Sequence, residues 1–502
     1  MTPTLLGLRG TRSPLLLALL ILCAPGLAAQ TNPWAPASLS LEEAVALARE
    51  NNPEYLQQRT DIAVARSSVR SAMGDLLPSA SAQNTFGYTA SGERRFESVG
   101  LGTQPEVYSS SYGIGLNYQL SGARLLQPSV ERARLNATQR RVTGAAAELE
   151  AQVANQYLTV LQAREQVAQA EREVARTGEH VRLAEARLEV GAGTPLDVRR
   201  AEVQQGRAQV NLVQSRNQAA TAVLVLAQLL GVQLDPAVEL TSRFSVFDPA
   251  WDAETLVAAA LQNNPGLLAA RASASAAGTA VTAARSSYLP SLSANMGWRG
   301  SVHQAGDIEP LVVDAMNNLS RNYAACLNQN EIRTRVGLGP VACVNPAAPG
   351  VAQEVRSSIE AQNSGFPFGY ERQPMSASLT VSLPIFTGFS RQLEVDRARA
   401  MAADAGYAVR AEELRLRQEV GTAVRNLETA HQTVLLQEQV RGNAAEELRL
   451  AQERFRFGAA NSVEVTDAQT NLAQAERDLV DAVYNFHKSL AALEALVGRN
   501  LR

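Results

Sequence analysis

The chain has 502 residues, a formal net charge of −3 and a pI near 6.0, so its charge gives no reason to expect nucleic-acid binding. Aromatic residues make up only 5% of it, while alanine, leucine, valine, glutamine, glutamate and arginine dominate. That composition argues against several thick globular cores and favours long helices.

The first segment, residues 1–29, has the pattern of a secretory signal peptide. Basic residues precede an apolar run at Leu15–Leu22, and small residues suited to cleavage follow at Leu27–Ala29. Cys23 leaves a lipidated start as an alternative, although Leu22 stands where a small residue would be expected. No other run approaches the ~20 apolar residues that a membrane helix needs. We therefore expect an exported chain without a helical membrane anchor.

The same motifs then occur twice in the same order. Asn51-Asn52-Pro53 and Leu77-Pro78-Ser79 recur 212 residues later, and Leu188–Val198 recurs 267 residues later as Phe455–Val465. This self-similarity predicts an internal duplication rather than a solenoid, because the unit is far too long for one. We expect a first repeat over residues 30–245 and a second over 246–502.

The second repeat carries about 55 additional residues, because the two offsets differ by that amount. We expect them to form an enlarged loop at about 303–374. The chain's remaining cysteines, Cys326 and Cys343, both lie in this segment. An exported chain can form disulfides, and neither cysteine has a neighbouring histidine or cysteine. The pattern favours a disulfide within the loop over a metal site.

Four segments alternate apolar and polar residues, as strands with one apolar face do. Two are clear, at 112–120 and 375–385, and two weaker copies at 80–88 and 292–298 follow the Leu-Pro-Ser motifs. Strands of about 9–11 residues with this alternation are typical of a transmembrane β-barrel. A half-buried sheet in a soluble protein is the alternative.

Four strands cannot close a barrel, and an open strand edge cannot lie in lipid. Several chains would therefore have to pool their strands. Two chains would give eight strands, an interior that side chains fill, whereas three would give twelve and leave room for a channel. We expect a trimer.

Long helices are predicted because no proline occurs between Pro128 and Pro195, and none follows Pro384. Apolar residues recur every seven positions in the first window, and the spacing returns 267 residues later from Val420 to Phe455. Such a repeat specifies helices packed side by side, and a helix of about 60 residues is ~90 Å long. The heptad positions in the first window are Val153, Val160, Val167, Val174, Val181 and Leu188.

Each long helix is expected to turn sharply and return, over residues 196–230 in the first repeat and 463–497 in the second. Gly191 and Gly458 suit the left-handed position that ends a helix. The first returning helix begins with a capping box, in which Thr194 is the cap, Pro195 opens the first turn and Asp197 follows three residues on. Asn461, Ser462 and Glu464 repeat this arrangement in the second. Shorter helices are expected at 42–73 and 254–285.

An enzyme is disfavoured, because none of the four histidines stands beside a plausible nucleophile or metal partner. We therefore expect no catalytic residue, metal or cofactor. A secreted coiled-coil adhesin would explain the heptads but not the four alternating strands, and a plain porin would not be more than half helical. The histidines are His180, His303, His431 and His487.

The order of these elements resembles that of the TolC-like outer membrane efflux proteins, the outer membrane factors of Gram-negative tripartite exporters. The resemblance covers essentially all of the mature sequence and includes the stretch Val463–Ala468. It implies a mainly helical trimer with transmembrane β structure. A shared twelve-stranded β-barrel, four strands per chain, would continue into a long α-helical coiled-coil barrel that crosses the periplasm.

The resemblance implies an outer membrane exit duct that carries small molecules such as drugs, toxic compounds or metals from an inner-membrane transporter. Type I protein secretion is the alternative, because it uses the same outer component. A periplasmic adaptor protein would contact the tip turns, and the 303–374 loop would face the outside. The implied adaptor-contacting residues are Gly191, Thr194, Pro195, Gly458, Asn461 and Ser462.

The resemblance also implies an acidic ring at the periplasmic entrance, formed by Glu464 and Asp467 and more weakly by Asp197. Capping is the alternative role for Glu464 and Asp197, and a solvated helix face for Asp467. The chain departs from the family at the tip, where Phe455 and Ala460 replace a tyrosine and an arginine that lock the closed state. Neither can make the same hydrogen bonds, so opening is expected to differ.

Overall fold

The computed structural model describes residues 38–96 and 99–501, so the expected signal peptide and Cys23 lie outside it. The described chain divides into two units, and each draws on both sequence repeats. The first, here called the helical unit, comprises residues 38–56, 148–250 and 423–493. The second, the sheet unit, comprises residues 57–147, 251–422 and 494–501. The units therefore cut across the duplication.

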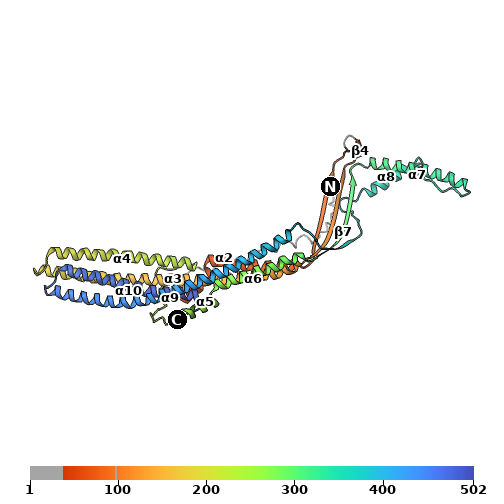
Figure 1. The fold of residues 1–502 in the computed structure, drawn as a ribbon. Helices are drawn as coiled ribbons and strands as arrows, with labels where there is room; N and C mark the ends of the chain where they lie inside the picture. Colours follow the sequence, from red (N-terminus) through yellow and green to blue (C-terminus); the bar gives the residue numbers. More distant parts are fainter. Residues whose placement is uncertain (1–37, 97–98, 502) are drawn as a thin grey trace, which may run out of the picture. The chain divides into compact units, whose positions relative to one another are not determined.

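The helical unit is built from four long helices that lie side by side (Figure 1). They are α3 (Gly122–Glu189), α4 (Pro195–Leu230), α9 (Ser390–Arg456) and α10 (Ser462–Val497); the first parts of α3 and α9 belong to the sheet unit. The predicted long helices and their returning partners are confirmed. With 68 and 67 residues, α3 and α9 are both longer than the expected length of about 60 residues. In α3 the additional length arises because the helix continues through Pro128.

The heptad pattern forms the core of the helical unit. Val153 and Val160 on α3 are fully buried against Leu226 and Leu230 of α4. Tyr157, between them, donates a hydrogen bond of 2.8 Å to the carbonyl of Leu39. That carbonyl belongs to a short parallel pair that the sequence did not predict, β1 (Ser38–Leu39) with β6 (Glu239–Leu240).

The repeated Asn-Asn-Pro motif has the same structural role in both repeats. Each motif lies between two short helices, α1 (Leu41–Asn51) and α2 (Pro53–Gly74) in the first repeat, α5 (Ala253–Asn263) and α6 (Pro265–Arg285) in the second. The second asparagine caps the following helix and donates to the end of a long returning helix. Asn52 donates to the Leu229 carbonyl at 2.9 Å, and Asn264 to the Leu496 carbonyl at 3.0 Å.

The glycine that ends each returning helix packs against the same motif. A Cβ at Gly231 would lie 2.3 Å from the Asn51 carbonyl oxygen, and one at Gly498 would lie 2.8 Å from that of Asn263. Both glycines also have positive φ, of 70° and 73°. Only glycine fits these positions, which explains why the two motifs recur together.

The sheet unit contains one antiparallel sheet in the order β2, β5, β7, with β8 and β9 both paired to β7. All four predicted strands are present. Three are longer than expected, and β9 is shorter than the predicted 375–385. The strands are β2 (Ser79–Thr89), β5 (Val107–Leu120), β7 (Ser291–Ala305), β8 (Glu371–Arg372) and β9 (Ser376–Ser382); a hairpin of β3 (Gly92–Phe96) and β4 (Val99–Gln104) extends β2, and a 3₁₀ turn, η2 (Ser286–Tyr288), precedes β7.

The register gives the sheet one apolar and one polar face, because cross-strand partners share a face. Ile114 is opposite Trp298, and Ala294 is opposite Leu379. Within one chain almost every residue of the edge strands β2 and β9 is exposed, whereas most residues of β5 and β7 are partly covered. Members of the apolar face include Leu116, Ile114, Met296, Trp298, Ala377 and Leu379; members of the polar face include Ser81, Gly115, Asn117, Asn295, Ser378 and Thr380.

The segment expected to be a loop at 303–374 is mostly helical. After β7 the chain forms α7 (Glu309–Arg335) and α8 (Val351–Gln362), which pack on each other and are joined at their base by the ion pair of Arg356 with Glu309. A disulfide joins Cys326 to Cys343. Among the described residues, no helix is apolar enough over a sufficient length to cross a membrane.

Candidate functional site

The two turns at the end of the helical unit are built alike. Gly191 and Gly458 have φ of 73° and 76°, the left-handed conformation expected after a helix end. At the first turn the predicted capping box is present: the Thr194 hydroxyl accepts from the Asp197 N–H, and the Asp197 carboxylate accepts from the Thr194 N–H at 3.1 Å. At the second turn the Asn461 side chain accepts from the Glu464 N–H at 3.0 Å.

The first turn is linked to the second through Asp197. Its Oδ1 accepts a hydrogen bond from the Ser462 hydroxyl, and its Oδ2 accepts from the Thr194 hydroxyl at 2.7 Å. The bond from Ser462 is the main cause that holds the pKa of Asp197 below its usual value, followed by the bonds from Thr194. Asp197 is therefore ionised and engaged at neutral pH, and it ties the start of α4 to the start of α10.

A second link is made by Arg187, near the end of α3. Its guanidinium lies 4.4 Å from the centre of the Phe455 ring and donates to the Phe455 carbonyl on α9. It also donates to the Ala192 carbonyl of its own turn at 2.9 Å. Phe455 is buried, at 4% exposure. Phe455, which stands where the family that the sequence resembles has a tyrosine, is thus held through its ring and its backbone.

His180 completes this cluster from two turns deeper on α3. Its ring centre lies 5.7 Å from that of Phe455, and its Nε2 has no hydrogen-bond partner within the described chain. Burial lowers the pKa of His180, which the charge of Asp197 only partly offsets. The imidazole is neutral at pH 7, so its role is packing, as expected for a histidine without a catalytic partner.

The three acidic residues proposed for an entrance ring lie in different environments. Asp197 is occupied by hydrogen bonds, as described above. Glu464 forms an ion pair with Arg454. Arg454 is the counterpart of Arg187 in the second repeat, because it also donates to a carbonyl of its own turn, that of Ala459. Asp467 is exposed, and no hydrogen bond or ion pair reaches it from the part of the chain described. Only Asp467 presents an uncompensated charge.

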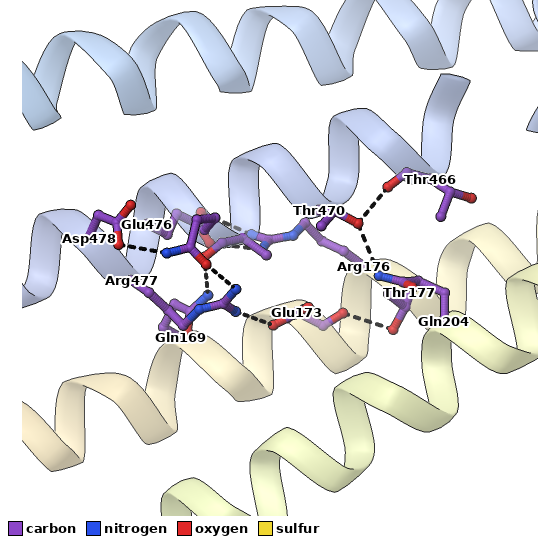
Figure 2. Close-up of polar contacts among 12 residues, drawn as sticks. Gln169, Glu173, Arg176, Thr177, Gln204, Thr466, Thr470, Glu476, Arg477 and Asp478 are labelled. Carbon is purple, nitrogen blue, oxygen red and sulfur yellow. Dashed lines mark hydrogen bonds and ion pairs between the residues drawn. The ribbon is translucent and has the colours of Figure 1, made fainter. Parts of the chain in front are cut away.

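Farther from the turns, a polar belt crosses the apolar core between α3 and α10 (Figure 2). Arg176 makes two parallel hydrogen bonds to Glu476, at 3.0 and 2.8 Å. Arg477 returns an ion pair of 3.5 Å to Glu173. The amide of Gln169 donates to the Ala473 carbonyl at 3.3 Å. These bonds satisfy groups that would be costly to bury alone, and they set the register of the two helices.

The belt was not predicted, although its signal is in the sequence. Gln169, Glu173 and Arg176 are spaced by four and three residues, which places them on one face of α3. These polar residues do not follow the seven-residue spacing of the apolar residues from which the helix packing was predicted. Gln469 on α10 is also buried, with both amide atoms unpaired within the described residues.

The sequence model of a family described as "Outer membrane efflux protein" matches residues 44–232 and 345–499. "Outer membrane protein TolC" of Vibrio cholerae is 24% identical over 466 residues, which cover 91% of this chain and 90% of that protein. α7 lies outside the family match.

Solved structures share the fold. A membrane protein from Pseudomonas aeruginosa superposes with a TM-score of 0.68 at 20% identity, over 92% of this chain and 90% of its own. The outer membrane protein VceC from Vibrio cholerae superposes with a TM-score of 0.66 at 15% identity, over 92% and 97% of the two chains. At these identities the likeness concerns the fold alone.

Proposed function

Because the chain belongs to the outer membrane efflux protein family, we propose that three copies assemble into one duct that spans the outer membrane. Family membership makes it an exit duct of a tripartite efflux system, located in the outer membrane of a Gram-negative bacterium and extending into the periplasm. It is a channel protein and not an enzyme.

The observation that carries the trimer is the incomplete sheet. Its edge strands β2 and β9 have no partner on their outer sides among the described residues, and nearly all residues of these two strands are exposed. Lipid offers no hydrogen bonds to such edges, so they have to pair with other copies. Three copies would contribute twelve strands, with the apolar face toward lipid and the small polar face toward a channel.

The paired turns are the proposed contact for a periplasmic adaptor protein, which would connect the duct to an inner-membrane transporter. Their glycines expose backbone, and the two turns are tied together by Asp197 and Ser462, so a partner would meet them as one surface. We assign the contact to Gly191, Thr194, Pro195, Gly458 and Asn461, while Ser462, which is 1% exposed, supports this surface through its bond to Asp197.

For the entrance we propose that Asp467 supplies most of the acidic ring. Three copies would bring three uncompensated Asp467 carboxylates together and attract cations. Glu464 contributes less because Arg454 neutralises it, and Asp197 contributes least because both its oxygens accept hydrogen bonds.

Small molecules such as drugs, toxic compounds or metals are the proposed cargo, supported by the efflux description of the family. Secretion of proteins by a type I system is the second candidate, since it needs the same outer component. The inner-membrane partner would decide between them.

Conductance across planar lipid bilayers tests the duct and its entrance together. We expect the purified protein to form cation-selective channels, and Asp467→Asn to weaken block by divalent cations more than Glu464→Gln does. Asp478→Asn, the same charge change farther along α10, is the matched control and should leave block unchanged. Absence of channels would contradict the duct; equal block in all variants would contradict the ring alone.

A further inference from the structure

A short aromatic segment lies across the apolar face of the sheet, close to the end that is remote from the long helices. The segment, residues 365–370, is here called the strap; it links α8 to β8. Phe368 packs edge-on against Phe86 at 6.3 Å between ring centres, Phe366 lies 5.8 Å from Tyr108, and Tyr370 lies 4.9 Å from Tyr112.

The register identifies the face that the strap covers. Phe86 and Tyr112 alternate with Thr85 and Gly113, and they share their face with Ile114, Trp298 and Leu379. This is the apolar face. Gly300 of β7 lies on it between the strap and β5, where a Cβ would be 2.3 Å from the Tyr112 ring and 3.0 Å from the Glu371 carbonyl oxygen. The missing side chain lets Tyr370 reach across β7.

The strap also satisfies the polar atoms of this face. Ser110 and Asn84 interrupt the apolar pattern, and Ser110 is only 1% exposed. The Tyr370 hydroxyl lies 3.1 Å from the Ser110 hydroxyl and donates to Asn84 Oδ1 at 3.1 Å. In contact with lipid these two groups would be costly without a partner. The strap is thus fitted to a surface that faces hydrocarbon.

The root of the α7–α8 hairpin is fixed at the same edge. Asn363, just before the strap, exchanges two hydrogen bonds of 2.7 Å with the backbone of Ala305 at the end of β7. The Gly306 N–H donates to the Glu106 carbonyl at 3.0 Å. The hairpin therefore leaves the sheet at its remote end and returns over the apolar face.

The far end of the hairpin, the loop closed by the Cys326–Cys343 disulfide, exposes unusually many apolar side chains. Ile332 is 63% exposed and Val336 65%. The last turn of α7 carries two arginines, of which Arg335 is paired with Glu331 and Arg333 donates to the Gly339 carbonyl. An exposed apolar cluster of this kind marks a binding surface. Its other members are Leu327, Leu338, Val341 and Val344.

We propose that the strap holds the α7–α8 hairpin on the lipid side of the barrel rim, and that its disulfide-closed end inserts into the outer leaflet of the outer membrane. The proposal rests on the barrel of the proposed function, because that assigns the apolar face to lipid. Continuity with this face favours lipid over a second copy of the hairpin across the channel mouth. Aromatic rings near the strand ends fit the interfacial girdle of membrane barrels.

The test uses full-length protein with one tryptophan, reconstituted in phosphatidylcholine vesicles with or without brominated acyl chains. Trp298 alone, with Trp34 and Trp251 replaced by phenylalanine, reports on the barrel. Val336→Trp in a chain with all three native tryptophans replaced reports on the end of the hairpin. Ser358→Trp, on the polar surface of α8, is the matched control.

We expect bromolipid to quench Val336→Trp to an extent comparable with Trp298 and to leave Ser358→Trp bright. Quenched Trp298 beside bright Val336→Trp would overturn the inference and leave the barrel intact. Equal quenching at Ser358→Trp would overturn the assignment of the disulfide-closed end, and a bright Trp298 would overturn the barrel itself. If Val336→Trp does not fold, Ile332→Trp serves as the second reporter.

Discussion

The helical unit and the sheet solve the same burial problem in different ways. On the long helices the apolar seam finds its partners within one chain, so Val153 and Val160 are 0% exposed. On the sheet, Leu379 and Val381 are both 69% exposed although they follow an equally regular pattern. A regular apolar pattern that one copy leaves uncovered indicates that lipid and other copies complete it. The packing of the helices is therefore complete within one chain, whereas that of the strands requires the assembly.

The largest effect is expected from a charge on the apolar face of the sheet. Leu379→Arg should prevent assembly, because an arginine facing lipid costs about 2–4 kcal/mol per copy near the bilayer midplane. The fraction of protein that migrates as oligomer in a mild-detergent gel measures it. Ser378→Arg, on the polar face of the same strand, is the control and should assemble far better. Equal loss in both variants would contradict the assignment of the faces.

The next effect concerns the link between the two helical turns. Arg187→Ala removes a cation–π contact and a charged hydrogen bond, together worth about 2 kcal/mol, or ~30-fold in the ratio of closed to open tips. Open probability in planar bilayers should rise accordingly. Arg182→Ala, five residues earlier, removes an exposed arginine that pairs only along its own helix with Glu179, and should change little. The same open probability in both variants would contradict the role of Arg187 in holding the two turns together.

Acid should loosen the tip through Asp197. Because bonds to its ionised form lower its pKa, their stabilisation is present above the ordinary pKa and is lost as the pH falls through the lowered one. Wild-type conductance should therefore rise only below about pH 4. Ser462→Ala removes the hydrogen bond that is the main cause of the lowered pKa of Asp197, so the rise in conductance should begin at less acidic pH. Thr433→Ala, a hydroxyl bonded within α9, should reproduce the wild-type profile; a shifted profile there would contradict the assignment.

The smallest effect separates two buried glutamines. Gln469→Met should be neutral or stabilise the protein by up to about 1 kcal/mol, because the amide it removes is unpaired. Gln169→Met should destabilise by about 1 kcal/mol, because it breaks the bond to the Ala473 carbonyl. Thermal unfolding of the assembled protein measures both. A change of thermal stability in the same direction for both variants would contradict the explanation that the hydrogen bond of Gln169 distinguishes the two glutamines.

Local and periodic features were predictable from the sequence. The four strands, the long helices, the left-handed glycines and the Thr194 capping box depend on residues within a few positions of one another, and the structure has them all. The duplication also predicted two equal sets of elements. The reason for its motifs was not visible, because Asn52 meets Leu229 only after the chain folds.

Contacts between distant segments were not predictable. Arg187 was one arginine among many in a helix, and only the fold brings it over Phe455. The α7–α8 hairpin was missed for another reason: it has no counterpart in the first repeat, so the duplication could not place it. Whether Asp467 lines an entrance depends on other copies and stays a prediction.

The number of chains per particle tests the account most directly. Native mass spectrometry of protein extracted in mild detergent, with cryo-electron microscopy of the same sample, should find three copies and β9 of each paired with β2 of the next. A folded single chain that remains stable in a bilayer, with both strand edges unpaired, would contradict it.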